Sequence, residues 1–186
     1  MRKHAALAAA LLLSACGAYP DSPVQLPPGA GVGRYSPTAN AISGAAEAFG
    51  NPAALAGRPA EAAVAVERLE WLAEAVPRNL EFTNYSPLTA PALQAARAEV
   101  RAALGIAPDA PPSLVIGALD QASSALARGD AASADASLAP PAFAPGMVAR
   151  LSRLPFLPQA SFATSRARRD LEFGRDEYEM GFLMRR

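Results

Sequence analysis

Residues 59–76 of this 186-residue chain, PAEAAVAVERLEWLAEAV, contain its clearest helical pattern. Apolar side chains recur there at the spacing of one helix face, at Ala65, Leu69, Leu72 and Val76. Alanine and leucine dominate, and runs of strand-favouring β-branched residues are nearly absent from the chain. The stretch therefore predicts an amphipathic helix that packs by its apolar face, within an all-α fold.

The same stretch also carries three glutamates, Glu67, Glu70 and Glu74. We expect them to form the solvated face of the helix, because the apolar stripe is plainly the core face. An alternative is that paired carboxylates on one helix face act as acid and base, or hold a hard cation. We prefer the solvated face and assign no metal site.

Shorter stretches on both sides have similar periodicity and are bounded by proline or glycine. The expected helices are 37–49, 89–104, 113–126, 130–138, 147–154 and 159–180. Expected boundary residues are the N-caps Thr89, Ser113 and Asp130 and the stops Gly105 and Gly129. Together they predict a small antiparallel helical bundle over 37–157, followed by a long, charged amphipathic helix and tail over 158–186.

Composition excludes several kinds of chemistry. Lys3 and His4 are the only lysine and histidine, and both lie in the first few residues. Beyond them, the chain cannot build a histidine-based nucleophile, a histidine metal site or a lysine phosphate loop. The formal net charge is 0, so the chain lacks the excess of positive charge that is typical of nucleic-acid-binding domains. We expect no enzyme activity, no cofactor and no nucleic-acid partner.

The N-terminus has the organisation of a cleavable secretory signal. Arg2 and Lys3 supply positive charge, and residues 5–12 are an apolar run of alanine and leucine. That run is shorter than the roughly 20 residues that a transmembrane helix needs. Small residues then precede Cys16, which is the only cysteine, so a disulfide within the chain is impossible.

The four residues Leu13-Ser14-Ala15-Cys16 match the lipobox position for position, and here the chain resembles bacterial lipoproteins. The resemblance implies that residues 1–15 are removed and that Cys16 is lipidated and anchors the chain in a membrane. Several acyl chains make such anchoring stable. In lipoproteins that stay in the inner membrane, an aspartate directly follows the lipidated cysteine. Here Gly17 stands at that position, so the resemblance implies the outer membrane and a domain that faces the periplasm. The resemblance covers the signal only, since the rest of the chain resembles no characterised family.

Residues 16–36 carry proline and glycine without apolar periodicity, so we expect a flexible tether between the lipidated Cys16 and the bundle. Fully extended, at about 3.1 Å per residue, it would reach roughly 60 Å. Its glycines at 29, 31 and 33 superficially resemble a nucleotide-binding loop, but no expected strand precedes them.

These features lead us to expect a structural or protein-interaction (adaptor) role at the cell envelope, with an envelope protein as partner. The alternative is a carrier or binder of a small apolar or lipid ligand between helices, near Phe49, Leu69 and Trp71. An adaptor requires an exposed apolar patch, and a carrier requires a closed cavity of at least about 300 Å³. A carboxylate-based hydrolase would need two acids facing each other across a cleft, which no spacing suggests.

Overall fold

The computed structural model describes residues 24–183, with side chains described through Phe173. This part of the chain is all helical, which confirms the predicted fold class. The α-helices are α1 (Pro37–Gly50), α2 (Pro59–Ala75), α3 (Thr89–Leu104), α4 (Pro112–Ala127), α5 (Ala131–Ser137), α6 (Met147–Leu151) and α7 (Pro158–Leu183). Short 3₁₀ turns are η1 (Pro28–Gly31), η2 (Pro52–Leu55) and η3 (Leu80–Phe82).

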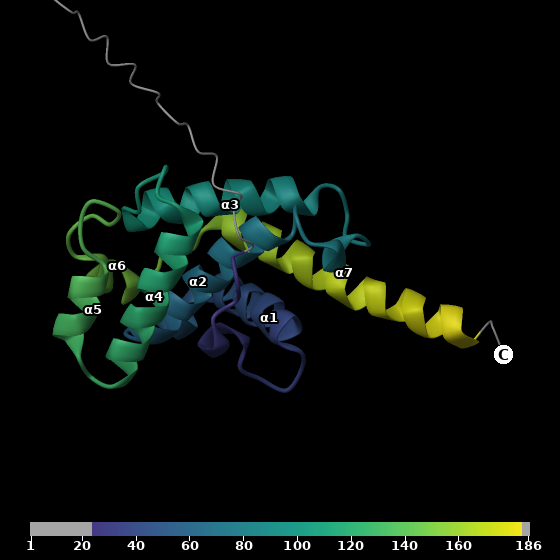
Figure 1. Cartoon of the computed structure of the whole chain (residues 1–186), viewed down its shortest axis with the longest axis horizontal. Coiled ribbons are helices and arrows are strands. Elements are labelled where there is room, and N and C mark those ends of the chain that lie inside the picture. The colour runs from purple at the N-terminus through teal and green to yellow at the C-terminus, as the bar shows by residue number, and fades with distance from the viewer. Residues whose placement is uncertain (1–23, 184–186) are drawn as a thin grey trace, which may run out of the picture.

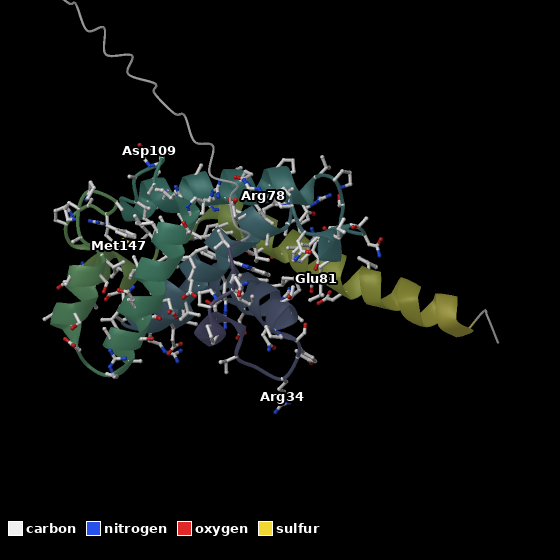
Figure 2. All side chains as sticks on the ribbon, in the orientation of Figure 1. Arg34, Arg78, Glu81, Asp109 and Met147 are labelled. Atoms are coloured by element: carbon white, nitrogen blue, oxygen red, sulfur yellow. The ribbon has the colours of Figure 1, made fainter. Side chains whose placement is uncertain are left out.

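The centre of the bundle is α2, which packs against α1, α3, α4, α6 and η1 (Figure 1). Its predicted stripe is buried, since Ala65, Leu69 and Leu72 are fully enclosed. Alanine is abundant in the core, so neighbouring helices approach closely and the bundle stays small. Met147 at the start of α6 lies within the bundle, whereas Arg34 and Asp109 point outward from their loops (Figure 2).

Helix α7 has two halves with different surroundings. Among its side chains described through Phe173, the buried ones are Ala160, Ala163, Thr164 and Ala167, and this part of the helix packs on α3 and α1. These alanines belong to the same core as the other helices, so the expected boundary at residue 157 does not separate two cores. The second half extends well beyond the rest of the bundle (Figure 1, yellow).

Most helix boundaries agree with the expectation, and two N-caps do not. Gly105 and Gly129 adopt positive φ where α3 and α4 end, and the Asp130 side chain caps α5 through the backbone N–H of Ser133. Thr89 is instead the first residue of α3, and its hydroxyl donates to Asp170 of α7. Ser113 lies inside α4 because Pro112 starts that helix.

Residues 24–36 pack against the bundle, which corrects the expectation of a tether for this part of 16–36. We call residues 24–36 the N-terminal strap. Ala30 and Gly31 of the strap are buried against α1 and α2, and Arg68 of α2 donates to the Ala30 carbonyl at 2.8 Å. Residues 16–23 lie outside the described part of the chain.

The strap is held mainly through its backbone. The Asn40 amide nitrogen donates to the carbonyls of Gly31 (2.9 Å) and Tyr35 (2.8 Å), and its oxygen accepts from the Tyr35 N–H (3.1 Å). Trp71 donates through its indole nitrogen to the Val24 carbonyl at 3.1 Å. Hydrogen bonds to the backbone do not require a hydrophobic period in the strap, so sequence periodicity could not predict that it packs on the bundle.

Candidate functional site

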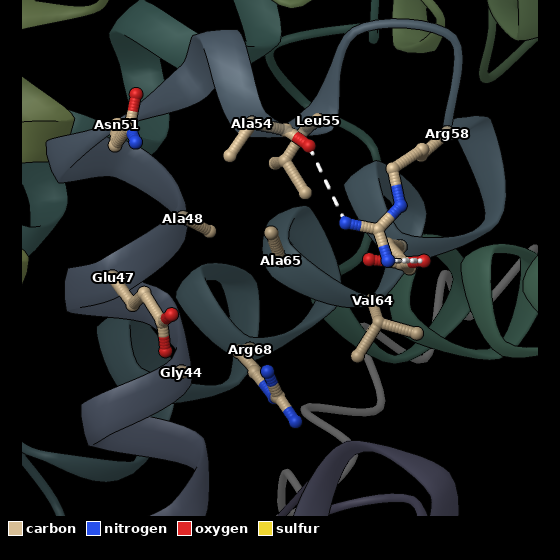
Figure 3. Close-up of a pocket in the computed structure, with 11 residues that line it drawn as sticks. Gly44, Glu47, Ala48, Asn51, Ala54, Leu55, Arg58, Val64, Ala65 and Arg68 are labelled. Atoms are coloured by element: carbon tan, nitrogen blue, oxygen red, sulfur yellow. Dashed lines mark hydrogen bonds and ion pairs between the residues drawn. The ribbon is translucent and has the colours of Figure 1, made fainter.

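A hollow of about 380 Å³ lies between α1 and α2 (Figure 3). Its floor is apolar and small, formed by Ala48, Leu55 and Ala65. Its rim is charged and polar, with Glu47, Asn51, Arg58, Glu61 and Arg68. Arg58 and Glu61 pair with each other at 2.5 Å, so one end of the rim is already neutralised. We call this feature the α1/α2 hollow.

Arg68 gives the α1/α2 hollow its local structure. Its Nε donates to the strap, while its guanidinium lies against Gly44 of α1. A Cβ at Gly44 would stand 2.1 Å from Nη1 of Arg68, so only glycine leaves room for this side chain in its present position. Within the part of the chain that the structure describes, the Arg68 terminal nitrogens have no acceptor, and Glu47 faces them across the hollow (Figure 3).

The three residues proposed for ligand binding do not converge on one cavity. Phe49 and Leu69 are fully buried in the core. Trp71 is also buried, but its edge lines a separate open hollow of about 380 Å³ together with Val24 and Leu80. We call it the Trp71 hollow. Neither the α1/α2 hollow nor the Trp71 hollow is a closed cavity between helices.

The expectation of a solvated glutamate face on α2 is wrong. Glu67, Glu70 and Glu74 are all buried, because α3 and α4 pack against the faces of α2 that carry them. Arg101 of α3 binds Glu70 with two hydrogen bonds of 2.7 Å, and Arg97 binds Glu74 at 3.1 Å. Glu74 also forms an ion pair with Arg78. The carboxyl groups of Glu70 and Glu74 are thus bound by arginines of α3 and hold α2 to that helix.

Arg101 also connects this pair to the loop after α3. Its Nη1 donates to the carbonyls of Ala107 (3.3 Å), Pro108 (3.0 Å) and Ala110 (2.9 Å). Planar guanidinium groups suit such multiple contacts, which one ammonium could not make. The cluster therefore explains Glu70 as a structural residue, and sequence spacing could not reveal it because the partner arginine lies 31 positions away.

Glu67 is different, because neither of its carboxyl oxygens has a hydrogen-bond partner in the described residues. Burial and, to a smaller extent, the nearby Asp120 of α4 raise the pKa of this carboxyl, Arg68 opposes them, and the net result is a pKa of about 8 in place of 4.5. The protonated, neutral form of Glu67 is therefore favoured at pH 7. A buried neutral acid against α4 has no cleft beside it, so we assign it no catalytic role.

Large apolar side chains are exposed on α7. Phe162 is 53% exposed and Phe173 is 67% exposed, and their separation of eleven residues is about three helical turns. They therefore lie on one stripe of the helix, with exposed Arg169 between them. We call Phe162, Arg169 and Phe173 the α7 stripe.

Contacts beside the α7 stripe fix the helix on α3. Arg166 donates to the hydroxyls of Ser86 (2.6 Å) and Thr89 (3.2 Å), and Asp170 accepts from the Ser86 N–H (3.2 Å) and from Thr89. These bonds hold the first half of α7 in a fixed orientation. The α7 stripe consequently faces solvent beside α3.

Of the remaining predicted site residues, Leu13, Ser14, Ala15 and Cys16 lie outside the described part of the chain. In the part that is described, no helix is long and apolar enough to span a bilayer, and no three acidic, histidine or cysteine side chains are grouped to hold a metal ion. No family model, curated protein or solved structure matches this chain.

Proposed function

We propose that this chain is a bacterial lipoprotein, anchored through a lipid on Cys16, whose helical domain faces the periplasm and acts by binding another protein. The anchor rests on Leu13-Ser14-Ala15-Cys16 and the signal before them. The outer membrane is the proposed location because Gly17 follows the lipidated residue. The domain has no catalytic role in this proposal.

One observation supports protein binding above the other roles: α7 extends beyond the bundle (Figure 1), and it exposes two phenylalanine side chains. Burying Phe162 and Phe173 in an interface would remove large apolar surfaces from water, at about 25 cal/mol per Å² of apolar area. Aromatic side chains are enriched in interfaces for this reason. Helices with an exposed apolar stripe commonly dock against a partner helix or groove.

The alternative function, a carrier of a small apolar or lipid ligand, has weaker support. The Trp71 hollow favours it because Trp71 and the highly exposed Leu80 offer apolar contact. However, Phe49 and Leu69 are packed in the core, and a carrier needs a pocket that encloses most of its ligand.

The lipid anchor is tested by comparing the wild type with Cys16→Ser. We expect the wild type to fractionate with membranes and to carry the mass of the acylated mature chain, and the variant to lose both properties. An unmodified mature wild-type chain free in the periplasm would contradict the anchor.

The interaction role is tested by photo-crosslinking in the same membranes. A photoreactive residue placed at Phe162 or Phe173 should give discrete protein adducts. The control position is Leu114, which is exposed on α4 and lies outside α7. Adducts of equal yield at Leu114, or none at either α7 position, would contradict α7 as the binding element.

A further inference from the structure

We infer that the Trp71 hollow is the face of the domain that rests on the lipid bilayer, with Leu80 inserted among the headgroups. This inference rests on the proposed lipid anchor and adds an orientation of the domain on its membrane. It follows from the attachment point of the chain, the rigid exposure of Leu80 and the charge at the rim of the hollow.

The first argument concerns where the domain is joined to its anchor. Val24 lines the Trp71 hollow, and the indole nitrogen of Trp71 donates to its carbonyl at 3.1 Å. Only residues 17–23 lie between Val24 and Cys16, and a segment of this length keeps its ends within about 3 nm of each other. A domain of about 150 residues is roughly 4 nm across. A bilayer that holds the lipid on Cys16 can therefore touch the side with the Trp71 hollow, whereas the opposite side of the domain is out of reach.

The second argument is the way in which Leu80 is presented. Its side chain is 88% exposed, more than any other large apolar side chain in the described part of the chain. Phe82, two residues later in η3, is buried and packs edge-on against Trp71, with ring centroids 6.2 Å apart. The Asn79 side chain caps η3 by accepting from the backbone N–H of Glu81 at 3.0 Å. Leu80 is thus held away from the core, where only an outside surface can cover it.

The third argument is the charge around the hollow. Arg78 at its rim has 53% of its side chain exposed, whereas Glu74, its ion-pair partner, has only 10% exposed. Glu81 lies outside the lining, and its carboxylate accepts from Thr38 of α1 at 3.4 Å. Among the lining residues, the charge that faces outward is therefore a guanidinium, which suits the phosphates of lipid headgroups. This face thus presents a cation beside the exposed Leu80.

A contact of one leucine and one arginine is weak, and the anchor makes it sufficient. Even a single myristoyl chain gives only marginal membrane binding, so Leu80 could not hold a free domain on a bilayer. With the lipid on Cys16 already inserted, docking of the hollow becomes an intramolecular step at high effective concentration. The domain therefore needs only a small gain in free energy to keep this face on the membrane.

The fluorescence of Trp71 tests the inference, because Trp71 is the only tryptophan in the chain. The purified lipidated chain is placed in vesicles of phosphatidylethanolamine and phosphatidylglycerol that also contain phosphatidylcholine brominated in the acyl chains near the headgroup. Bromine quenches tryptophan only at short range, so we expect these vesicles to lower the Trp71 fluorescence relative to vesicles without bromine. Equal fluorescence in the two kinds of vesicle overturns the inference.

Leu80→Asp and Leu114→Asp form a matched pair of variants. Both residues are exposed leucines, but Leu114 lies on α4 and does not line the hollow. Loss of the leucine side chain from the bilayer contact should lower the docking constant of Leu80→Asp about tenfold, so most of the quenching should disappear. Leu114→Asp should be quenched like the wild type. Equal quenching of Leu80→Asp and the wild type, or an equal loss in both variants, overturns the inference.

Intact mass separates this inference from the proposed anchor, because it shows whether Cys16 is acylated. An unacylated mature chain overturns the anchor and the inference together. An acylated, membrane-bound chain without quenching overturns the orientation alone and leaves the anchor in place.

The mature Cys16→Ser chain distinguishes a bilayer contact from the carrier alternative. This chain is mixed with the brominated vesicles and then separated from them, and its Trp71 fluorescence should recover fully. Quenching that persists after separation shows that the hollow has extracted a lipid molecule, which overturns the bilayer contact in favour of a carrier.

Discussion

Glu67 and Glu70 lie one turn apart on α2, and their surroundings differ. The carboxyl group of Glu70 accepts two short hydrogen bonds from the Arg101 guanidinium, which suits a buried acid. Glu67 has no such partner, and Asp120 lies nearby, so the neutral acid is favoured. An unpaired buried charge is costly, and a buried carboxyl avoids that cost by keeping its proton.

Glu67 should make the stability of the bundle depend on pH. Its pKa is about 8 in the folded chain and near 4.5 when exposed, so the folded chain binds more protons between these values. The free energy of unfolding should therefore fall as the pH rises from 4.5 to 8, by at most about 1.4 kcal/mol per pH unit. Glu67→Gln removes this titration. We expect the variant to match the wild type near pH 5 and to be more stable by about 3–4 kcal/mol at pH 8.

Urea unfolding followed by circular dichroism at pH 5, 6, 7 and 8 measures this effect. Glu61→Gln is the matched control, because it makes the same change at an exposed position of α2. The control should keep the pH dependence of the wild type. Parallel curves for Glu67→Gln and the wild type would show that Glu67 is already ionised at neutral pH.

At the scale of elements, the strap depends on one side chain of α1. Asn40 uses both its amide nitrogen and its oxygen on the strap backbone, and its own side chain is buried. Gly33 leaves space for it, since a Cβ there would lie 2.5 Å from the Asn40 oxygen. Asn40 therefore joins the strap to α1 through three hydrogen bonds.

Asn40→Ala should release the strap and leave the helices in place. Loss of three hydrogen bonds, two of them to backbone carbonyls, should lower the free energy of unfolding by about 2–3 kcal/mol. The measurement is amide hydrogen exchange, which should become faster at Val32 and Tyr35 and stay unchanged at Ala163 in α7. Asn51→Ala, a change in an exposed asparagine after α1, is the control. Unchanged protection at Tyr35 in Asn40→Ala would mean that Arg68 and Trp71 hold the strap without Asn40.

The helices themselves were largely predictable, because each has apolar residues at the spacing of one face. The surroundings of α2 were not, although one signal was present. Ala62, Ala63, Val66 and Ala73 extend the apolar surface of α2 beyond the predicted stripe, as expected for a helix with neighbours on more than one side. The glutamates concealed this pattern, because the arginines that compensate them come from another helix.

For the whole molecule, the second half of α7 should contribute little to the stability of one copy. Chain termination after Phe173 keeps every buried position of α7 among the side chains that the structure describes. We expect the free energy of unfolding to change by less than about 0.5 kcal/mol. Urea unfolding at low protein concentration, where copies are separate, measures this.

Ala167→Glu is the contrasting change, because Ala167 is fully buried in the first half of α7. A charge placed there without a partner should cost several kcal/mol. If truncation after Phe173 destabilises the bundle as much as Ala167→Glu does, the second half must fold back on its own domain.

Docking of the strap also sets how far the domain can travel from a membrane. Trp71 donates to the carbonyl of Val24, and only seven residues, 17–23, lie between Cys16 and Val24. With Cys16 lipidated as proposed, the segment from Cys16 to Val24 spans at most about 28 Å. A segment that stayed free as far as residue 36 would span roughly 60 Å, more than twice as much. The bundle is thereby confined to a thin layer next to the lipid headgroups. Confinement to such a layer raises the local density of neighbouring copies, so a contact too weak to persist in dilute solution can form on the membrane.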